Sequence, residues 1–185
     1  MKNKNGFLIA MVIPVFILLG MAVQPLLTLF WGQEILLETR PFDPRDIFRG
    51  DYVNLSYQIE EVPIEKFPAK LLSLSENTNE KTDYRKVQKV YGVLKETNGY
   101  MVIDYITLEK PKDKIFIKGN LPVYNAFLYR DKNSNYPVFV NFGLDKYFVP
   151  ENTGTELEDA SRQGKIAARV KVYNGYALLV GLSIQ

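Results

Sequence analysis

The side chains that could do chemistry are concentrated in one short segment, residues 43–52. This segment contains Asp43, Arg45, Asp46, Arg49, Gly50, Asp51 and Tyr52. Carboxylates and guanidinium groups this close together can bind a ligand, a lipid headgroup or another protein through charge-assisted hydrogen bonds. They also suit a structural role, because aspartate side chains cap turns and arginines pair with them. We favour the structural role for the charged groups. Of the surfaces that the sequence suggests, this segment with Tyr52 is nevertheless the best candidate for contact with a partner.

Few catalytic mechanisms are available to this chain, because it contains no histidine and no cysteine. Ser-His-Asp and Cys-His centres, imidazole or thiolate metal sites and a disulfide framework are therefore excluded. A Ser-Lys dyad of the signal-peptidase type lacks its nucleophile, because no serine lies between Trp31 and Leu55 and the hydroxyls there belong to Thr39 and Tyr52. Ser56 is the alternative hydroxyl.

The charged segment leads into a stretch with the pattern of a half-buried strand. From Tyr52 to Gln58 apolar and polar residues alternate, and the apolar face of this pattern consists of Val53, Leu55, Tyr57 and the following Ile59. Tyr52 and Tyr57 are five positions apart, so they point to opposite faces, which assigns Tyr57 to the core and leaves Tyr52 for a surface contact. Arg49-Gly50-Asp51 also matches an adhesion tripeptide, but glycine and aspartate before a strand are typical of an ordinary turn.

Two Asn-Gly pairs predict β-hairpins, because Asn-Gly supplies the two positive φ angles of a type I′ turn. Asn98-Gly99 joins strands at 86–97 and 100–110, and Asn174-Gly175 joins strands at 165–173 and 176–184. Shorter strands are expected at 34–40, 115–118, 122–129 and 138–142. In the second hairpin we expect these side chains to point inward: Ile166, Ala168, Val170, Val172, Leu178, Val180, Leu182 and Ile184.

One helix is expected beyond the apolar N-terminus, from about Thr155 to Gln163. A capping box at Thr155 to Glu158 and Gly164 after the last turn support it. A hydrolase that works with carboxylates alone needs two acids about 5–10 Å apart. Acids are available here, but helix capping already explains Glu156 and Glu158. The predicted fold is therefore mostly β: a β-rich single domain with hairpins and one short helix, preceded by one N-terminal transmembrane helix.

The transmembrane helix is predicted from the absence of charge between Asn5 and Gln33. The apolar run Phe7–Trp31 is longer than the roughly 20 residues that a bilayer requires. Pro14 and Pro25 are tolerated in a membrane helix, where they produce kinks or lie near an end. The alternative is a signal peptide cleaved near Ala22, which we disfavour because the apolar run continues to Trp31.

The charges that flank the apolar run predict its orientation. Lys2 and Lys4 precede it, and Glu34 and Glu38 follow it before the first cation, Arg40. The positive-inside rule then leaves the N-terminus in the cytoplasm and the C-terminal domain outside the cell membrane. We expect two parts, with the cytoplasmic tip and transmembrane helix at 1–32 and the extracytoplasmic β-rich domain at 33–185.

The exported part is formally neutral. The chain has 23 Lys and Arg against 21 Asp and Glu, and the two lysines before the apolar run reduce the exported count to 21 against 21. Nucleic-acid binding needs a basic stripe to displace counterions, so we expect no nucleic-acid partner. No cofactor or metal motif is present, and none is expected.

The stretch Gly50-Asp51-Tyr52-Val53-Asn54-Leu55-Ser56-Tyr57 agrees with all five positions that define the GDYXXLXY family of bacterial membrane-anchored proteins. The chain also resembles this family at 41–49 and in the run 143–151, which includes Tyr147, Phe148, Pro150 and Glu151. The family is functionally uncharacterised. Because its members are often found with multi-pass membrane proteins, the resemblance implies a partner of that kind.

These observations predict a non-enzymatic accessory or binding module that is anchored by lipid contacts of its N-terminal helix. Its partner would be a multi-pass membrane protein or an envelope component. The alternative is an envelope hydrolase with a site near Gly50-Asp51-Tyr52. That alternative requires a polar pocket in which Asp51, or a lysine and hydroxyl pair, is unpaired and has a displaced pKa.

Overall fold

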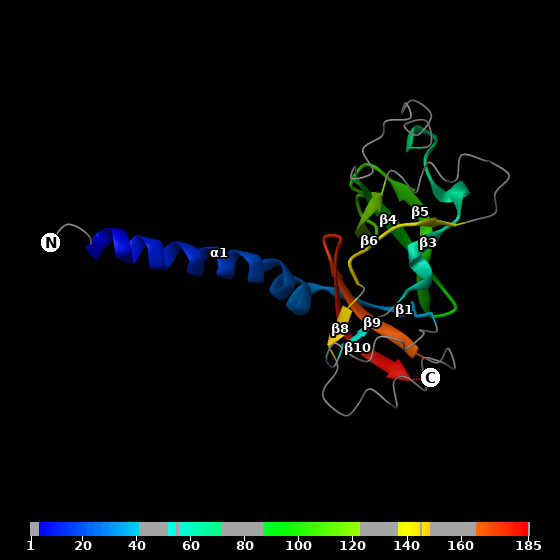
Figure 1. The fold of residues 1–185 in the computed structure, drawn as a ribbon. Helices are drawn as coiled ribbons and strands as arrows, with labels where there is room; N and C mark the ends of the chain where they lie inside the picture. The colour runs from blue at the N-terminus through cyan, green and yellow to red at the C-terminus, as the bar shows by residue number, and fades with distance from the viewer. Residues whose placement is uncertain are drawn as a thin grey trace.

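The protein is described by a computed structural model that covers residues 4–40, 52–54, 56–71, 87–122, 137–144, 146–148 and 166–184. This part of the chain is one long N-terminal helix followed by short strands (Figure 1). In chain order the elements are α1 (Lys4–Trp31), β1 (Gln33–Glu38), β2 (Tyr52–Asn54), the 3-10 helix η1 (Gln58–Glu60), β3 (Glu61–Val62), the 3-10 helix η2 (Ile64–Lys66), β4 (Val87–Thr97), β5 (Tyr100–Thr107), β6 (Phe116–Pro122), β7 (Val138–Phe139), β8 (Lys146–Phe148), β9 (Ile166–Tyr173) and β10 (Tyr176–Ile184).

The mostly β fold class with one apolar N-terminal helix is confirmed. A short second helix is present at 69–71. The helix predicted from Thr155 to Gln163 lies outside the described residues, as does the strand predicted at 122–129 except for Pro122, which ends β6.

Helix α1 projects from the β domain as one continuous rod that contains Pro14 and Pro25 (Figure 1). Its stretch Ile9–Trp31 has 23 residues, and the most apolar part of this stretch is not buried against the rest of the chain. At 1.5 Å per residue the stretch measures about 34 Å, against about 30 Å for the hydrocarbon core of a bilayer. The helix is therefore long and apolar enough to cross a membrane.

Within the described ranges the strands form two three-stranded sheets, in the orders β1-β9-β10 and β5-β4-β6, and two short pairs, β2-β8 and β3-β7. All of these pairings are antiparallel. Both predicted hairpins are confirmed. Asn98 and Gly99 have φ angles of 52° and 82°, and Asn174 and Gly175 have 52° and 81°, as type I′ turns require.

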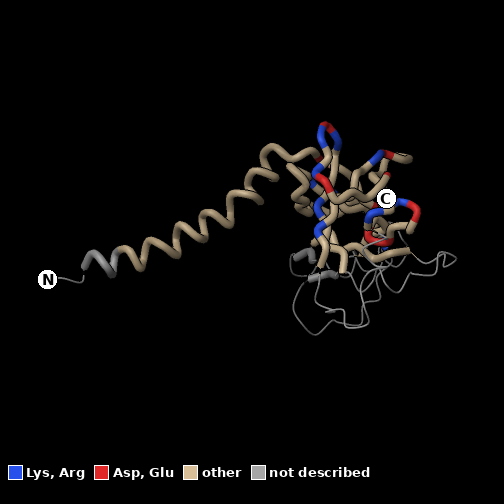
Figure 2. Tube along the Cα trace, turned by 90° about the horizontal axis from the view of Figure 1, so that it is seen from above, with Lys and Arg blue, Asp and Glu red and all other residues tan. Residues whose placement is uncertain are grey.

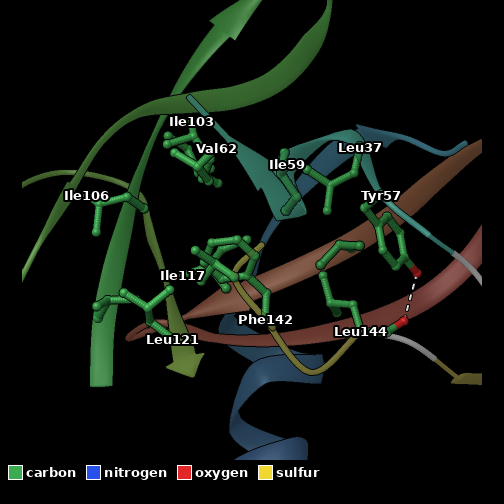
Figure 3. Close-up of a cluster of buried hydrophobic side chains, with 14 of the residues drawn as sticks. Leu37, Tyr57, Ile59, Val62, Ile103, Ile106, Ile117, Leu121, Phe142 and Leu144 are labelled. Atoms are coloured by element: carbon green, nitrogen blue, oxygen red, sulfur yellow. Dashed lines mark hydrogen bonds between the residues drawn. The ribbon is translucent and has the colours of Figure 1, made fainter. Parts of the chain in front are cut away.

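One hydrophobic core joins the two larger sheets (Figure 3). Leu37 on β1 and Val170 on β9 come from one sheet, and Ile106 and Ile117 come from the other. Segments outside the two sheets fill the space between them with the buried side chains of Tyr57, Ile59, Val62, Phe142 and Leu144. The two sheets therefore share their packing.

The inward side chains predicted for β10 are partly wrong. Val172 lies opposite Ala177 and Val170 lies opposite Leu179, so Ala177 and Leu179 pack on the core in place of Leu178 and Val180. A two-residue turn imposes this pairing, because directly opposed residues share a face of the sheet. An irregularity in the pairing between Leu179 and Gly181 then shifts the register by one residue. As a result Leu182 lies opposite Ala168 and packs on the core, as predicted.

Strand β6 extends beyond the predicted 115–118 and ends at Pro122. Its extra length is held by pairing with β4, in which Val90 lies opposite Gly119. A Cβ atom on Gly119 would lie 2.8 Å from the Phe142 ring, and one on Gly92 of β4 would lie 3.1 Å from it. The two glycines therefore form a slot for this aromatic ring, which explains why a residue with low strand propensity lies inside the strand.

Candidate functional site

The two segments that resemble the family lie side by side in the fold. Strand β2 pairs with β8, so that Tyr52 lies opposite Phe148, Val53 opposite Tyr147 and Asn54 opposite Lys146. These segments are far apart in the sequence. We refer to residues 50–57 and 143–151 together as the two-motif region.

Tyr57 connects the two halves of this region through its side chain. Its ring is 1% exposed, and its hydroxyl donates a hydrogen bond of 2.9 Å to the carbonyl oxygen of Leu144 (Figure 3). The prediction that Tyr57 belongs to the core is confirmed. A buried carbonyl without a partner costs about 1–3 kcal/mol, so this hydroxyl stabilises the junction of the two segments.

The strand predicted from Tyr52 to Gln58 is shorter in the structure. After β2 the chain makes an isolated bridge between Tyr57 and Thr39 and then enters η1. The carboxylate of Glu60 accepts the Tyr57 N–H at 3.2 Å, and the Glu60 N–H donates to the Tyr57 carbonyl at 3.2 Å. These two bonds close a turn in place of an extended strand. Ile59 is nevertheless buried, as its place in the alternation predicted.

Polar contacts tie the end of β1 to this region. Arg40 forms a bidentate ion pair with Glu61, in which one of the N–O distances is 2.6 Å. The Arg40 N–H donates to the Ser56 carbonyl at 2.8 Å. The Thr39 hydroxyl is buried and donates to the Ile166 carbonyl at 2.6 Å. A hydroxyl held in this way is not available as a nucleophile.

A second feature, at the other end of β1, joins the helix to the domain without a linker. Gly32 alone separates α1 from β1, and its N–H donates to the Thr28 carbonyl at 2.9 Å. A Cβ atom at this glycine would lie 2.2 Å from the same carbonyl oxygen. The Lys171 ammonium donates to the Leu29 carbonyl at 2.7 Å, which places a cation at the helix C-terminus, where the helix dipole favours it. The junction is therefore tightly fitted.

The model of the GDYXXLXY protein family matches residues 14–182. The chain belongs to the GDYXXLXY family. No curated protein and no solved structure matches the chain. The family match includes most of α1 as well as the β domain, so the family model describes the helix and the β strands together.

Most of the residues that name the GDYXXLXY motif or surround it are outside the described part of the chain: Asp43, Arg45, Asp46, Arg49, Gly50, Asp51, Leu55, Pro150 and Glu151. Tyr52, Tyr147 and Phe148 are placed by their backbone pairing alone. The structure thus brings the two motif segments together, and the role of the charged cluster stays a prediction.

Several residues next to the two-motif region and at the junction at Gly32 were not assigned their structural roles from the sequence. Thr39, Glu60, Gly32 and Lys171 each act through a partner that is distant in the sequence or through a buried backbone atom. Gly32 had a signal, because a glycine directly after an apolar run can mark a helix end. Within the described ranges, no group of three or more acidic side chains is arranged to hold a metal ion.

Proposed function

We propose that this protein is a non-enzymatic binding module, anchored in the cell membrane with its N-terminus in the cytoplasm and its β domain outside. In this proposal residues 1–32 are the tip and the transmembrane helix, and residues 33–185 are the exported domain. The partner is a multi-pass protein of the same membrane. The two-motif region, with the charged segment 43–51 and Tyr52, forms the contact surface.

The observation that supports this proposal best is the tightly fitted junction at Gly32. A domain that follows its helix without a linker has a fixed height and tilt relative to the helix axis. A surface held in this way loses less orientational freedom when it binds a partner in the same membrane. Confinement to one membrane also raises the effective concentration of the two proteins, so even a modest surface suffices for association.

The composition of the contact surface supports the same proposal. The charged segment can supply paired carboxylates and guanidinium groups, which give specificity and orientation to an interface. The pairing of β2 with β8 provides a backbone support for Tyr52, and tyrosine is one of the residues enriched in the core of interfaces. The Thr39 hydroxyl, one of the two hydroxyl side chains between Trp31 and Leu55, is engaged with the Ile166 carbonyl, which weighs against a hydrolase that would use it as a nucleophile.

The proposal is tested by photo-crosslinking in native membranes with a photoreactive amino acid in place of Tyr52. We expect one adduct with a multi-pass membrane protein. We expect this adduct to be absent when Asp51→Asn is introduced into the same chain. The matched control carries the same amino acid in place of Glu96, an exposed residue of β4. Adducts with lipid or the protein itself alone, or the same adducts from both positions, would contradict the proposal.

A structural role of the motif is distinguished by thermal unfolding of the Asp51→Asn and Tyr52→Ala variants in detergent. The proposal expects Asp51→Asn to lose the adduct of the position-52 crosslinker, and both variants to keep an unfolding temperature close to that of the wild type. A loss of stability that parallels the loss of the adduct would make the segment a structural motif and not a contact surface.

A further inference from the structure

The side of the β domain nearest the end of α1 has a shallow groove of about 420 Å³. It is formed by the start of β1, the connection between β5 and β6 and the turn between β9 and β10. Its polar lining includes Gln33, Asn174, the two lysines Lys110 and Lys114, and one carboxylate, Asp113. Figure 1 shows this turn on the side of the domain from which the helix departs. The groove is distinct from the two-motif region.

A smaller hollow of about 190 Å³ lies beside the groove and is lined by Lys89, Lys118 and Asn120 among others. The two hollows are close to each other, because Lys118 lines the smaller one and its N–H donates to the Gly175 carbonyl at 2.8 Å. Gly175 is in the turn that lines the groove. We refer to the two neighbouring hollows together as the membrane-side groove.

The position of Gln33 sets the height of this groove relative to a membrane. Gln33 follows Trp31, the last residue of α1, by two positions, a distance of at most about 7 Å at 3.3 Å per strand residue. The headgroup layer of a bilayer is about 5–8 Å thick on each side. Phe30 and Trp31 are 70% and 67% exposed, as aromatic residues at a membrane interface are. With α1 across the membrane, the groove therefore lies at the headgroup layer.

The groove is also basic, although the exported part as a whole is neutral. Residues 108–118 contain four lysines, Lys110, Lys112, Lys114 and Lys118, against Glu109 and Asp113. All four lysines are exposed, and no carboxylate among the described residues pairs with them. Figure 2 shows lysine and arginine segments, with acidic segments between some of them, along the side of the domain nearest the helix.

One of these lysines is held in place by an aromatic ring. The Lys114 ammonium lies 5.1 Å from the centre of the Tyr105 ring and 3.4 Å from its hydroxyl oxygen. This contact orients the side chain without neutralising its charge. Lys171, at the end of α1, adds a further cation next to the same turn. An ammonium group is a compact point charge that suits phosphate.

We propose that the membrane-side groove binds the headgroup of an anionic phospholipid in the membrane that holds α1. Lys110 and Lys114 contact the phosphate, and Lys118 extends the basic surface toward β4. The location in the headgroup layer favours a lipid over an acidic protein segment, because lipid phosphates are present there at high local concentration. The inference requires α1 to cross the membrane, but it does not depend on the protein partner proposed above.

The test uses the full chain in micelles of an uncharged detergent. An environment-sensitive dye is attached to the cysteine that the substitution Pro111→Cys introduces. The absence of native cysteine makes the labelling specific. Short-chain phosphatidylglycerol should give a saturable change in emission, and short-chain phosphatidylcholine at the same concentration should not. Replacing Lys110 and Lys114 by glutamine should raise the midpoint about 25-fold, since each lysine near the headgroups contributes roughly fivefold. The matched control, Lys70→Gln with Lys95→Gln, removes the same charge and should leave the midpoint within about twofold.

Each of the following results would overturn the inference. An equal response to phosphatidylcholine would show that the groove does not distinguish an anionic from a zwitterionic headgroup. An equal loss of affinity in the control pair would show that binding depends on the net charge of the protein alone. Saturation by inorganic phosphate in the same range would identify a soluble anion as the ligand. If the glutamine variant does not fold by circular dichroism, the wild-type titration at 1 M salt decides, because phosphate binding by lysines must weaken there. An unchanged midpoint at high salt would contradict the proposal.

Discussion

The two Asn-Gly hairpins have the same turn but different surroundings. The φ angles of Gly99 and Gly175 are 82° and 81°. A Cβ atom on Gly99 would meet nothing within 4 Å, whereas one on Gly175 would lie 2.4 Å from the Phe116 ring. The β4–β5 turn is therefore open to solvent, and the β9–β10 turn is packed against the neighbouring sheet.

This difference shows that local sequence determines the turn, while the tertiary position determines what the turn does. The β9–β10 hairpin contacts both of its neighbours. Lys171 holds the end of α1 through the Leu29 carbonyl, and Gly175 holds β6 through the Lys118 N–H. The hairpin thus joins the helix to both sheets, and we expect changes in it to cost more than matched changes in the β4–β5 hairpin.

The largest difference is expected between Gly175→Ala and Gly99→Ala. Each substitution places a side chain at positive φ, which costs about 1–2 kcal/mol. Gly175→Ala also forces a methyl group into the Phe116 ring, which adds about 1–3 kcal/mol of overpacking. Denaturant unfolding of the full chain in detergent measures both. Equal losses would break the comparison, because they would mean that the β9–β10 turn is as free as the β4–β5 turn.

A smaller difference is expected between two tyrosine hydroxyls. Tyr57→Phe leaves the buried Leu144 carbonyl without its donor and should cost about 1–3 kcal/mol. Tyr105→Phe removes an exposed hydroxyl whose contact with Lys114 is 3.4 Å long, and should cost less than about 0.5 kcal/mol. The same unfolding experiment applies. A Tyr57→Phe variant as stable as Tyr105→Phe would show that the junction of the two motif segments does not depend on this bond.

The smallest effect on stability is expected from two hairpin lysines, Lys171 of β9 and Lys95 of β4. Lys171→Gln removes a cation from the helix C-terminus, worth about 0.3–1 kcal/mol, and Lys95→Gln removes a surface ion pair with Asp104 that is worth about 0–1 kcal/mol. Stability alone does not separate these variants. Hydrogen exchange of the Gly32 amide does, because it should accelerate in Lys171→Gln and stay unchanged in Lys95→Gln. No acceleration in either variant would mean that Lys171 does not hold the junction.

The features that could be predicted from the sequence are those fixed by neighbouring residues. The apolar helix, the two Asn-Gly turns and the burial of Tyr57 all follow from composition, turn chemistry or alternation. The inward face of β10 also depended on the turn, since pairing across a two-residue loop places Ala177 opposite Val172. Only the shift near Gly181 lacked a local signal.

The features that could not be predicted depend on partners distant in the sequence. The pairing of β2 with β8 is invisible in either segment alone, because many strands have compatible patterns. The extension of β6 through Gly119 depends on the Phe142 ring that lies over it. The chemistry of the candidate contact surface rests on Asp51 and its neighbours, which the described residues do not include, so that part of the account still comes from the sequence.

The central claim is that α1 crosses the membrane and holds the β domain on the outer face. Single cysteines in this cysteine-free chain test it directly with a membrane-impermeant maleimide. In cells with an intact membrane, Glu96→Cys should be labelled, and Asn3→Cys should be labelled only after permeabilisation. Labelling of Asn3→Cys from outside, protection of Glu96→Cys, or a mature chain that begins near Val23 would contradict the account.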